Sequence, residues 1–106
     1  MKPTRPAAVI PSLVGERLQV WGKCIRKQRV AQNITALDLC QRIDISRPTP
    51  VRMERGEGSV AVALYLAAFH VLGLLEIAAP LPELSLWEME HEGARAARRS
   101  DDADYF

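Results

Sequence analysis

The sequence predicts an all-α protein of five helices. Apolar residues recur at helical spacing in successive segments, residues that cap or end helices lie between these segments, and no strand-like alternation is present. The chain has 106 residues, of which 48 % are hydrophobic and 25 % charged, as is ordinary for one globular domain with a modest core.

The first helix is predicted from Ser12 to about Ala31. Ser12 can cap its N-terminus, and Asn33 readily accepts the left-handed conformation that follows many helix C-termini. The apolar stripe that should face the core comprises Val14, Leu18, Trp21 and Ile25. Residues 1–11 contain three prolines, so we expect them to form a flexible N-terminal arm.

A second helix and a third should follow after very short connections. Thr35 is the predicted cap of the second helix, which should end at Asp44, with Leu39, Cys40 and Ile43 toward the core. Ser46 is the predicted cap of the third, from about Arg47 to Arg55 and closed by Gly56. Two helices joined by so short a turn cross steeply, in the geometry called helix-turn-helix. Pro50 lacks the N–H that would bond to the Ser46 carbonyl, so the first turn should loosen.

The fourth and fifth helices complete the prediction. Ser59 should cap the fourth, which ends at Gly73 and is apolar on nearly every face, so we expect it to meet both the core and a partner surface. Residues 12–79 would then form one domain. After Pro80 and Pro82, a C-terminal helix is predicted from about Glu83 to Arg99 within residues 80–99, and residues 100–106 should be disordered.

Charge is distributed unevenly along the chain. Residues 1–60 carry eleven Lys or Arg against five Asp or Glu, a formal charge of +6, whereas residues 61–106 carry −5. This asymmetry indicates one half that faces a polyanion; a merely solvated surface is the alternative. No secretory signal or membrane span is visible, so a cytoplasmic location is expected.

Catalysis and metal binding are not expected. The sequence has no recognisable catalytic motif and no phosphate-binding glycine loop, so the chain should not be an enzyme. The possible zinc ligands lack ligand spacing, and no cofactor is predicted; these residues are Cys24, Cys40, His70 and His91.

The stretch from Trp21 to Gly56 resembles the xenobiotic-response-element (Cro/repressor-like) helix-turn-helix family. The matching positions are Ile25, Arg29, Thr35, Leu39-Cys40, Asp44-Ile45-Ser46 and Glu54-Arg55-Gly56. Two positions depart from the pattern: Ala36 stands where a phosphate-binding Gln is common, and Pro50 replaces an aliphatic core residue. The resemblance implies a five-helix repressor-like domain with a C-terminal helical extension.

A sequence-specific, DNA-binding transcriptional repressor is the function that this resemblance implies. Arg29 and Glu54 would form a structural salt bridge between the first and third helices. The residues expected to contact bases are Arg47, Pro48, Thr49 and Arg52. Those expected to contact the DNA backbone are Lys23, Arg26, Lys27, Thr35, Arg42, Ser46 and Arg55.

A second resemblance concerns residues 56–76, GEGSVAVALYLAAFHVLGLLE, which look like the fourth-helix region of HipB-like antitoxins. It implies a protein that autoregulates its operon and pairs with a HipA-like kinase toxin. A homodimer is expected because a helix-turn-helix protein reads two half-sites. The expected dimer or partner contacts are Leu84, Leu86, Trp87 and Met89, although Leu84, Trp87 and Met89 could equally belong to the core. The alternative is a protein-interaction module that neutralises a toxin with little DNA binding of its own, as Ala36 and Pro50 would suggest.

Overall fold

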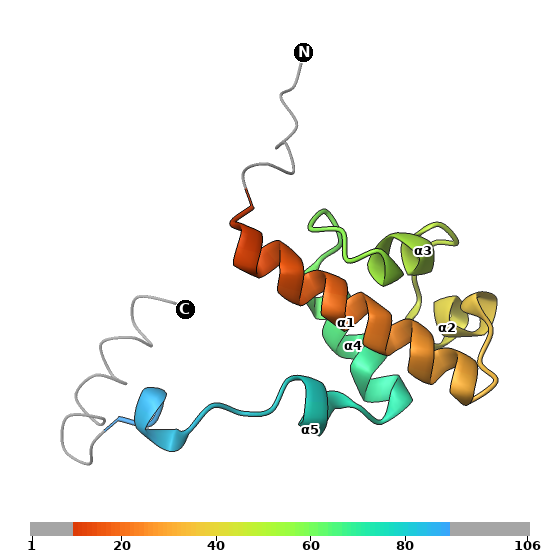
Figure 1. Cartoon of the computed structure of the whole chain (residues 1–106). Helices are drawn as coiled ribbons and strands as arrows, with labels where there is room; N and C mark the ends of the chain where they lie inside the picture. The colour runs from red at the N-terminus through yellow and green to blue at the C-terminus, as the bar shows by residue number, and fades with distance from the viewer. Residues whose placement is uncertain (1–9, 90–106) are drawn as a thin grey trace, which may run out of the picture.

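A computed structural model describes residues 10–89 of the chain (Figure 1). Over this range the fold is all-helical and contains no strand. The helices are α1 (Ser12–Ala31), α2 (Ala36–Ile43), α3 (Thr49–Glu54), α4 (Val62–Leu72) and α5 (Leu75–Ala78). A single 3-10 turn, η2, follows at Leu84–Leu86. None of these helices is both long and apolar enough to cross a membrane.

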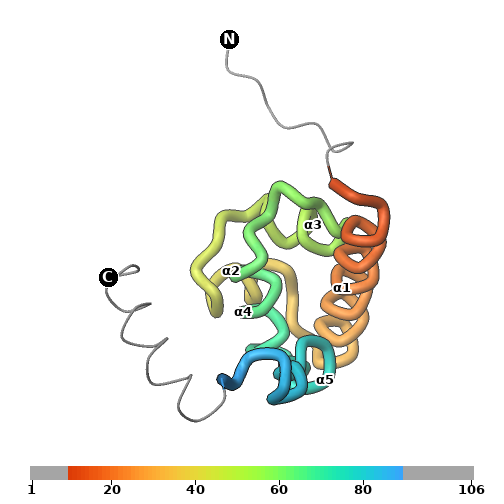
Figure 2. The backbone as a smooth tube through the Cα atoms, turned by 90° about the vertical axis from the view of Figure 1, so that its left-hand side faces the viewer, coloured from red at the N-terminus to blue at the C-terminus, as the bar shows by residue number. Residues whose placement is uncertain are grey.

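The long helix α1 packs against both α3 and α4, while α2 packs against α3 and α4, and α5 contacts α4. Figure 2 shows α1 on one side of the bundle, with α3 and α5 at its opposite ends. Tyr65 and Phe69 of α4 are fully buried at the centre, and Trp21 meets Phe69 edge-on, with ring centroids 5.1 Å apart. The remaining buried hydrophobic residues are Leu18, Ile25, Ile34, Leu39, Cys40, Met53, Val60, Ala68 and Leu72.

The bounds predicted for the first helix are confirmed, but its cap is not. Pro11 occupies the capping position and Ser12 is the first helical residue, with no side-chain cap bond at this end. Val14 is half-exposed, so the N-terminal turn of α1 extends beyond the core that the apolar stripe was expected to fill. Asn33 adopts the predicted left-handed conformation, with φ of 57°.

The second helix begins and ends as predicted. The Thr35 hydroxyl accepts a hydrogen bond from the Asp38 amide at 3.0 Å, and Asp44 ends the helix with φ of 54°. The third helix, in contrast, begins at Thr49 rather than Arg47, so Ser46 is not its cap. Pro50 explains this difference, because the first α-type bond that remains is the one from the Arg52 amide to the Pro48 carbonyl.

The fourth helix also begins later than predicted. It starts at Val62, so Ser59 is not its cap; the Ser59 hydroxyl is instead bonded to the guanidinium of Arg52. Gly73 ends this helix with φ of 76°, as predicted. Val62 is half-exposed, whereas the residues of α4 that face the core are buried: Tyr65, Ala68, Phe69 and Leu72.

The predicted fifth helix is wrong over residues 83–89. Only the η2 turn forms there, and every residue from Pro80 to Met89 is exposed. A short helix needs tertiary packing to be stable, and no other part of residues 10–89 buries this segment. Figure 1 shows it leading away from the helices. Helix α5 was not predicted. The expected arm at 1–9, the rest of the C-terminal helix and the tail at 100–106 lie outside the described residues.

Candidate functional site

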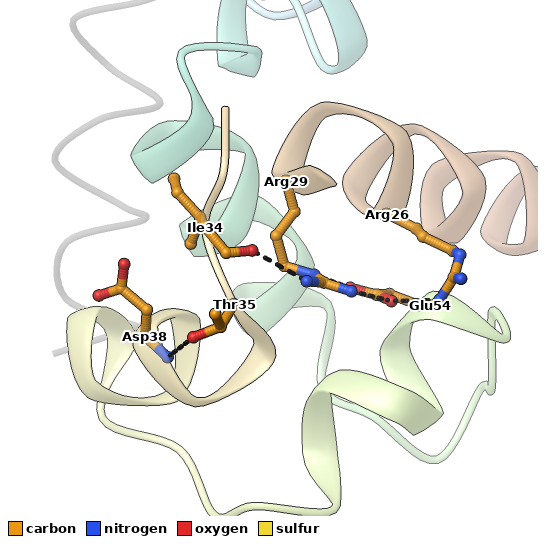
Figure 3. A network of polar contacts seen from close by, with 6 residues as sticks. All are labelled: Arg26, Arg29, Ile34, Thr35, Asp38 and Glu54. Carbon is orange, nitrogen blue, oxygen red and sulfur yellow. Dashed lines mark hydrogen bonds and ion pairs between the residues drawn. The ribbon is translucent and has the colours of Figure 1, made fainter. Parts of the chain in front are cut away.

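The most buried ion pair in the described part of the chain joins α1 to α3 through two hydrogen bonds (Figure 3). Arg29 donates from Nε to Glu54 Oε2 at 2.7 Å and from Nη2 to Oε1 at 3.1 Å. Its Nη1 donates to the carbonyl of Ile34 at 2.9 Å. The two charged side chains are only 12 % and 8 % exposed. The pair therefore ties α1, the loop before α2 and the end of α3 to one another.

The hydrogen bonds from Arg29 to Glu54 raise the pKa of the guanidinium, an effect that burial opposes and the carboxylate's charge reinforces. Arg29 thus stays fully charged. Arg26, which is exposed, approaches the same carboxylate at 3.7 Å. The family resemblance had paired Arg29 with Glu54; the structure adds Arg26 and the Ile34 carbonyl to the same network.

Two glycines allow α1 to lie directly on the end of α3. A Cβ atom at Gly22 would be 2.6 Å from the carbonyl oxygens of Met53 and Glu54. A Cβ at Gly56, where φ is +77°, would be 2.5 Å from the Cα of Gln19. Gly22 carries no signal of this role in the sequence, because a glycine inside a helix only lowers helix propensity until its packing neighbour is known.

The N-terminal end of α3 is open to solvent. Arg47 and Pro48 are exposed, and Thr49 is half-buried. The Thr49 hydroxyl lies 2.9 Å from that of Ser46. Cys40 donates a weak hydrogen bond to the Ser46 carbonyl, with Sγ and O 3.6 Å apart, so the turn between α2 and α3 is held to α2. Three of the predicted base-contacting residues therefore lie together at the accessible start of α3: Arg47 in the turn before it, Pro48 at its cap and Thr49 as its first residue.

Arg52, the fourth predicted base contact, has protein partners. Its Nε donates to Glu57 Oε1 at 3.1 Å and its Nη2 to the Ser59 hydroxyl at 2.6 Å. Sequence reasoning missed both partners: they lie five and seven residues on, across the turn at Gly56, where helical spacing gives no signal. Glu57 also lies 3.9 Å from Arg55, a predicted backbone contact.

The loop that carries these partners is anchored by a buried tyrosine. The Tyr65 hydroxyl donates to the backbone carbonyl of Glu57 at 2.8 Å. Burial, and secondly the negative charge of Glu57, raise the pKa of Tyr65 to about 12. The phenol therefore keeps its proton, and its hydrogen bond, throughout the neutral pH range.

Six of the seven predicted backbone contacts fall into two groups, and the seventh, Arg55, directly follows the last residue of α3. Thr35, Arg42 and Ser46 belong to α2 and the turns that flank it, and Arg42 is paired with Asp38 at 3.1 Å. The second group lies on α1, beside the C-terminal end of α3 and not its N-terminal end. With Val30, these side chains line a hollow of about 300 Å³; they are Lys23, Arg26 and Lys27.

The predicted dimer or partner residues are uncovered. Leu84, Leu86, Trp87 and Met89 are between 44 % and 76 % exposed. Trp87 donates its indole N–H to the Pro82 carbonyl at 3.0 Å, which orders the segment locally without burying it. The chain therefore presents an apolar strip that nothing within residues 10–89 covers.

Residues 10–89 contain no group of three or more His, Cys, Asp or Glu side chains that could hold a metal ion. Cys40 is a buried free thiol and Cys24 a half-buried one. His91 lies outside the described range. Comparison of the chain with protein-family models, with curated proteins and with solved structures finds no match.

Proposed function

We propose that this chain is a sequence-specific DNA-binding repressor, in which α2, the turn at 44–48 and α3 act as a helix-turn-helix. The observation that supports this best is the accessible N-terminal end of α3, where the exposed Arg47 lies in the turn just before the helix and the half-buried Thr49 is its first residue. In this motif the N-terminal part of the second helix of the pair enters the major groove. An Arg there can donate two hydrogen bonds to O6 and N7 of guanine.

The fixed position of α3 against α1 favours sequence-specific binding of DNA over non-specific binding. Binding costs less when the contacting helix is already held in place. Here the Arg29–Glu54 ion pair and the close approach at Gly22 fix α3 against α1 without using any side chain from its exposed end. The helix can therefore keep one orientation before and after it meets DNA.

Phosphate contacts would come from the α2 side of this surface. The hydroxyls of Thr35 and Ser46 and the guanidinium of Arg42 belong to α2 and its flanking turns. Ala36 has no side-chain amide to bind a phosphate at the first position of α2, so phosphate binding there depends more on charged side chains. The α1 cations Lys23, Arg26 and Lys27 lie by the other end of α3, where they would reach only DNA that extends past the recognised bases.

A two-fold dimer would complete the repressor. Two α3 helices about one DNA turn apart, roughly 34 Å, read a palindromic operator, and the exposed strip at 84–89 supplies apolar surface for pairing. We include in the proposal that the protein represses its own operon as the antitoxin of a HipA-like kinase toxin. The support for this last step is the likeness of residues 56–76 to HipB-like antitoxins.

Selection from a pool of random duplexes, followed by binding measurements, tests the proposal. The wild-type chain should enrich one sequence, and Arg47→Ala should lose about 1–3 kcal/mol on it and relax the preference at one base pair. Arg17→Ala is the matched control, because this exposed Arg carries the same charge and lies next to Leu18 and Gln19, which meet Gly56 after the C-terminal end of α3 and not its N-terminal end. Failure to enrich any sequence, or equal losses for both variants, would contradict DNA reading by α3.

A second function has its own support. The apolar strip at 84–89 also suits a module that neutralises a partner toxin with little DNA binding. Co-expression with the product of the neighbouring gene distinguishes the two functions. A module of this kind would form a stable complex that Trp87→Ser weakens, while the chain selects no duplex.

A further inference from the structure

Arg52 has two hydrogen-bond partners and several donors left over. Its Nε donates to Glu57 and its Nη2 to Ser59, and Nη1 has no partner within residues 10–89. A guanidinium has five N–H donors in a fixed plane. Three N–H groups therefore remain, two on Nη1 and one on Nη2, and guanidinium N–H donors are the groups that pair with O6 and N7 of guanine.

The partners of Arg52 are themselves held in place. The Glu57 carbonyl accepts the hydroxyl of Tyr65, whose ring is fully buried, and the Glu57 amide donates to the Arg52 carbonyl at 3.1 Å. Gly56 makes the turn that brings the loop back over α3, with φ of +77°. The backbone of Glu57 is thus anchored to the core by bonds that a change of its side chain would leave intact.

The charges at this place suit selection among sequences better than affinity for DNA in general. Glu57 repels phosphates, and it lies within 4 Å of two arginines, Arg52 at 3.1 Å and Arg55 at 3.9 Å. The negative charge of Glu57 therefore weakens the general attraction of these two arginines to DNA. An Arg whose plane is fixed discriminates between bases, because its remaining N–H donors fit only one pattern of acceptors.

We propose that Glu57 and Ser59 are positioning residues that fix the guanidinium plane of Arg52 for base recognition, and so set part of the sequence preference. This inference rests on the proposed DNA-binding function. Glu57 and Ser59 touch no base themselves; they act through Arg52. The loop between α3 and α4 is then part of the recognition surface, a role that its sequence did not indicate.

The test compares Glu57→Gln, Ser59→Ala and the control Asp38→Asn on a duplex selected with the wild-type chain and on a random duplex. Asp38–Arg42 is a matched ion pair, with the same 3.1 Å contact and similar exposure. Glu57→Gln should lower the ratio of the affinity for the selected duplex to the affinity for the random duplex about three- to fivefold. This fold-change corresponds to the upper range of free energies measured for exposed ion pairs. Ser59→Ala should lower it less. Asp38→Asn should change both affinities alike and leave the ratio unaltered.

A second readout does not involve DNA. In the free protein, exchange of the Arg52 Nε–H with water should be slower than that of Arg17, and Glu57→Gln should remove the difference. If the wild type selects a site but Glu57→Gln keeps the same ratio, or if Arg52 exchanges as fast as Arg17, the positioning role is wrong. If the wild type selects no site, the proposed function itself fails and this inference fails with it.

Discussion

Replacement of Glu54 by alanine should destabilise the fold by about 3 kcal/mol. Removal of one partner from a buried ion pair costs about 3–5 kcal/mol, because the other charge stays buried without compensation. Arg29 is 12 % exposed and keeps its bond to the Ile34 carbonyl at 2.9 Å, so part of its hydration and one acceptor remain. These two features place the expected loss at the lower end of the range.

Urea unfolding followed by circular dichroism measures this loss. Asp38→Ala is the matched control, since it also breaks an ion pair to Arg, but at the surface, where such pairs contribute about 0.3–0.5 kcal/mol. The double variant Glu54→Ala with Arg29→Met should regain part of the loss, because it no longer buries a lone charge. Equal small losses for Glu54→Ala and Asp38→Ala would refute the claim that this pair locks α1 to α3.

Three further perturbations test the fold and the apolar strip. Gly22→Ala should lower the free energy of unfolding by about 2 kcal/mol, because its Cβ would be 2.6 Å from carbonyl oxygens of α3. Gly15→Ala, whose Cβ would have nothing within 4 Å, should raise it by up to about 1 kcal/mol, so thermal unfolding of the two variants separates packing from helix propensity. Because the fold raises the pKa of Tyr65 from 10.0 to about 12, the protonated phenol stabilises the fold fully below about pH 10, and this stabilisation should be lost as the pH rises toward about 12. Thermal melts between these pH values should show the loss in the wild type and not in Tyr65→Phe. Leu86→Ser with Trp87→Ser should convert a dimer to a monomer in light scattering, and a wild-type monomer would contradict pairing through this strip.

Local signals in the sequence predicted much of the fold. Thr35, Asp44 and Gly73 end or begin helices where expected, because each acts through its own backbone and a neighbour one turn away. The predicted caps at Ser12 and Ser59 are wrong. A serine can cap a helix but need not, and the hydroxyl of Ser59 accepts a hydrogen bond from Arg52, seven residues earlier in the chain.

Contacts between distant segments account for the remaining differences. The resemblance placed Arg29 opposite Glu54, but nothing local indicated that Gly22 is needed for the same helix crossing. A helix was predicted around Trp87 after the prolines at 80 and 82, yet no neighbour in residues 10–89 buries this segment, and only one 3-10 turn forms there. Periodicity shows which face a helix would bury, and packing decides whether the helix exists.

Amide chemical shifts of the full chain, recorded as a duplex selected from the random pool is added, show which residues meet DNA. The largest changes should fall on residues 35–39 and 46–59, at the start of α2 and from the turn before α3 to the loop after it. Residues 81–89 should show only small changes. Changes confined to residues 77–89, or none at saturating duplex, would contradict recognition of DNA by α3.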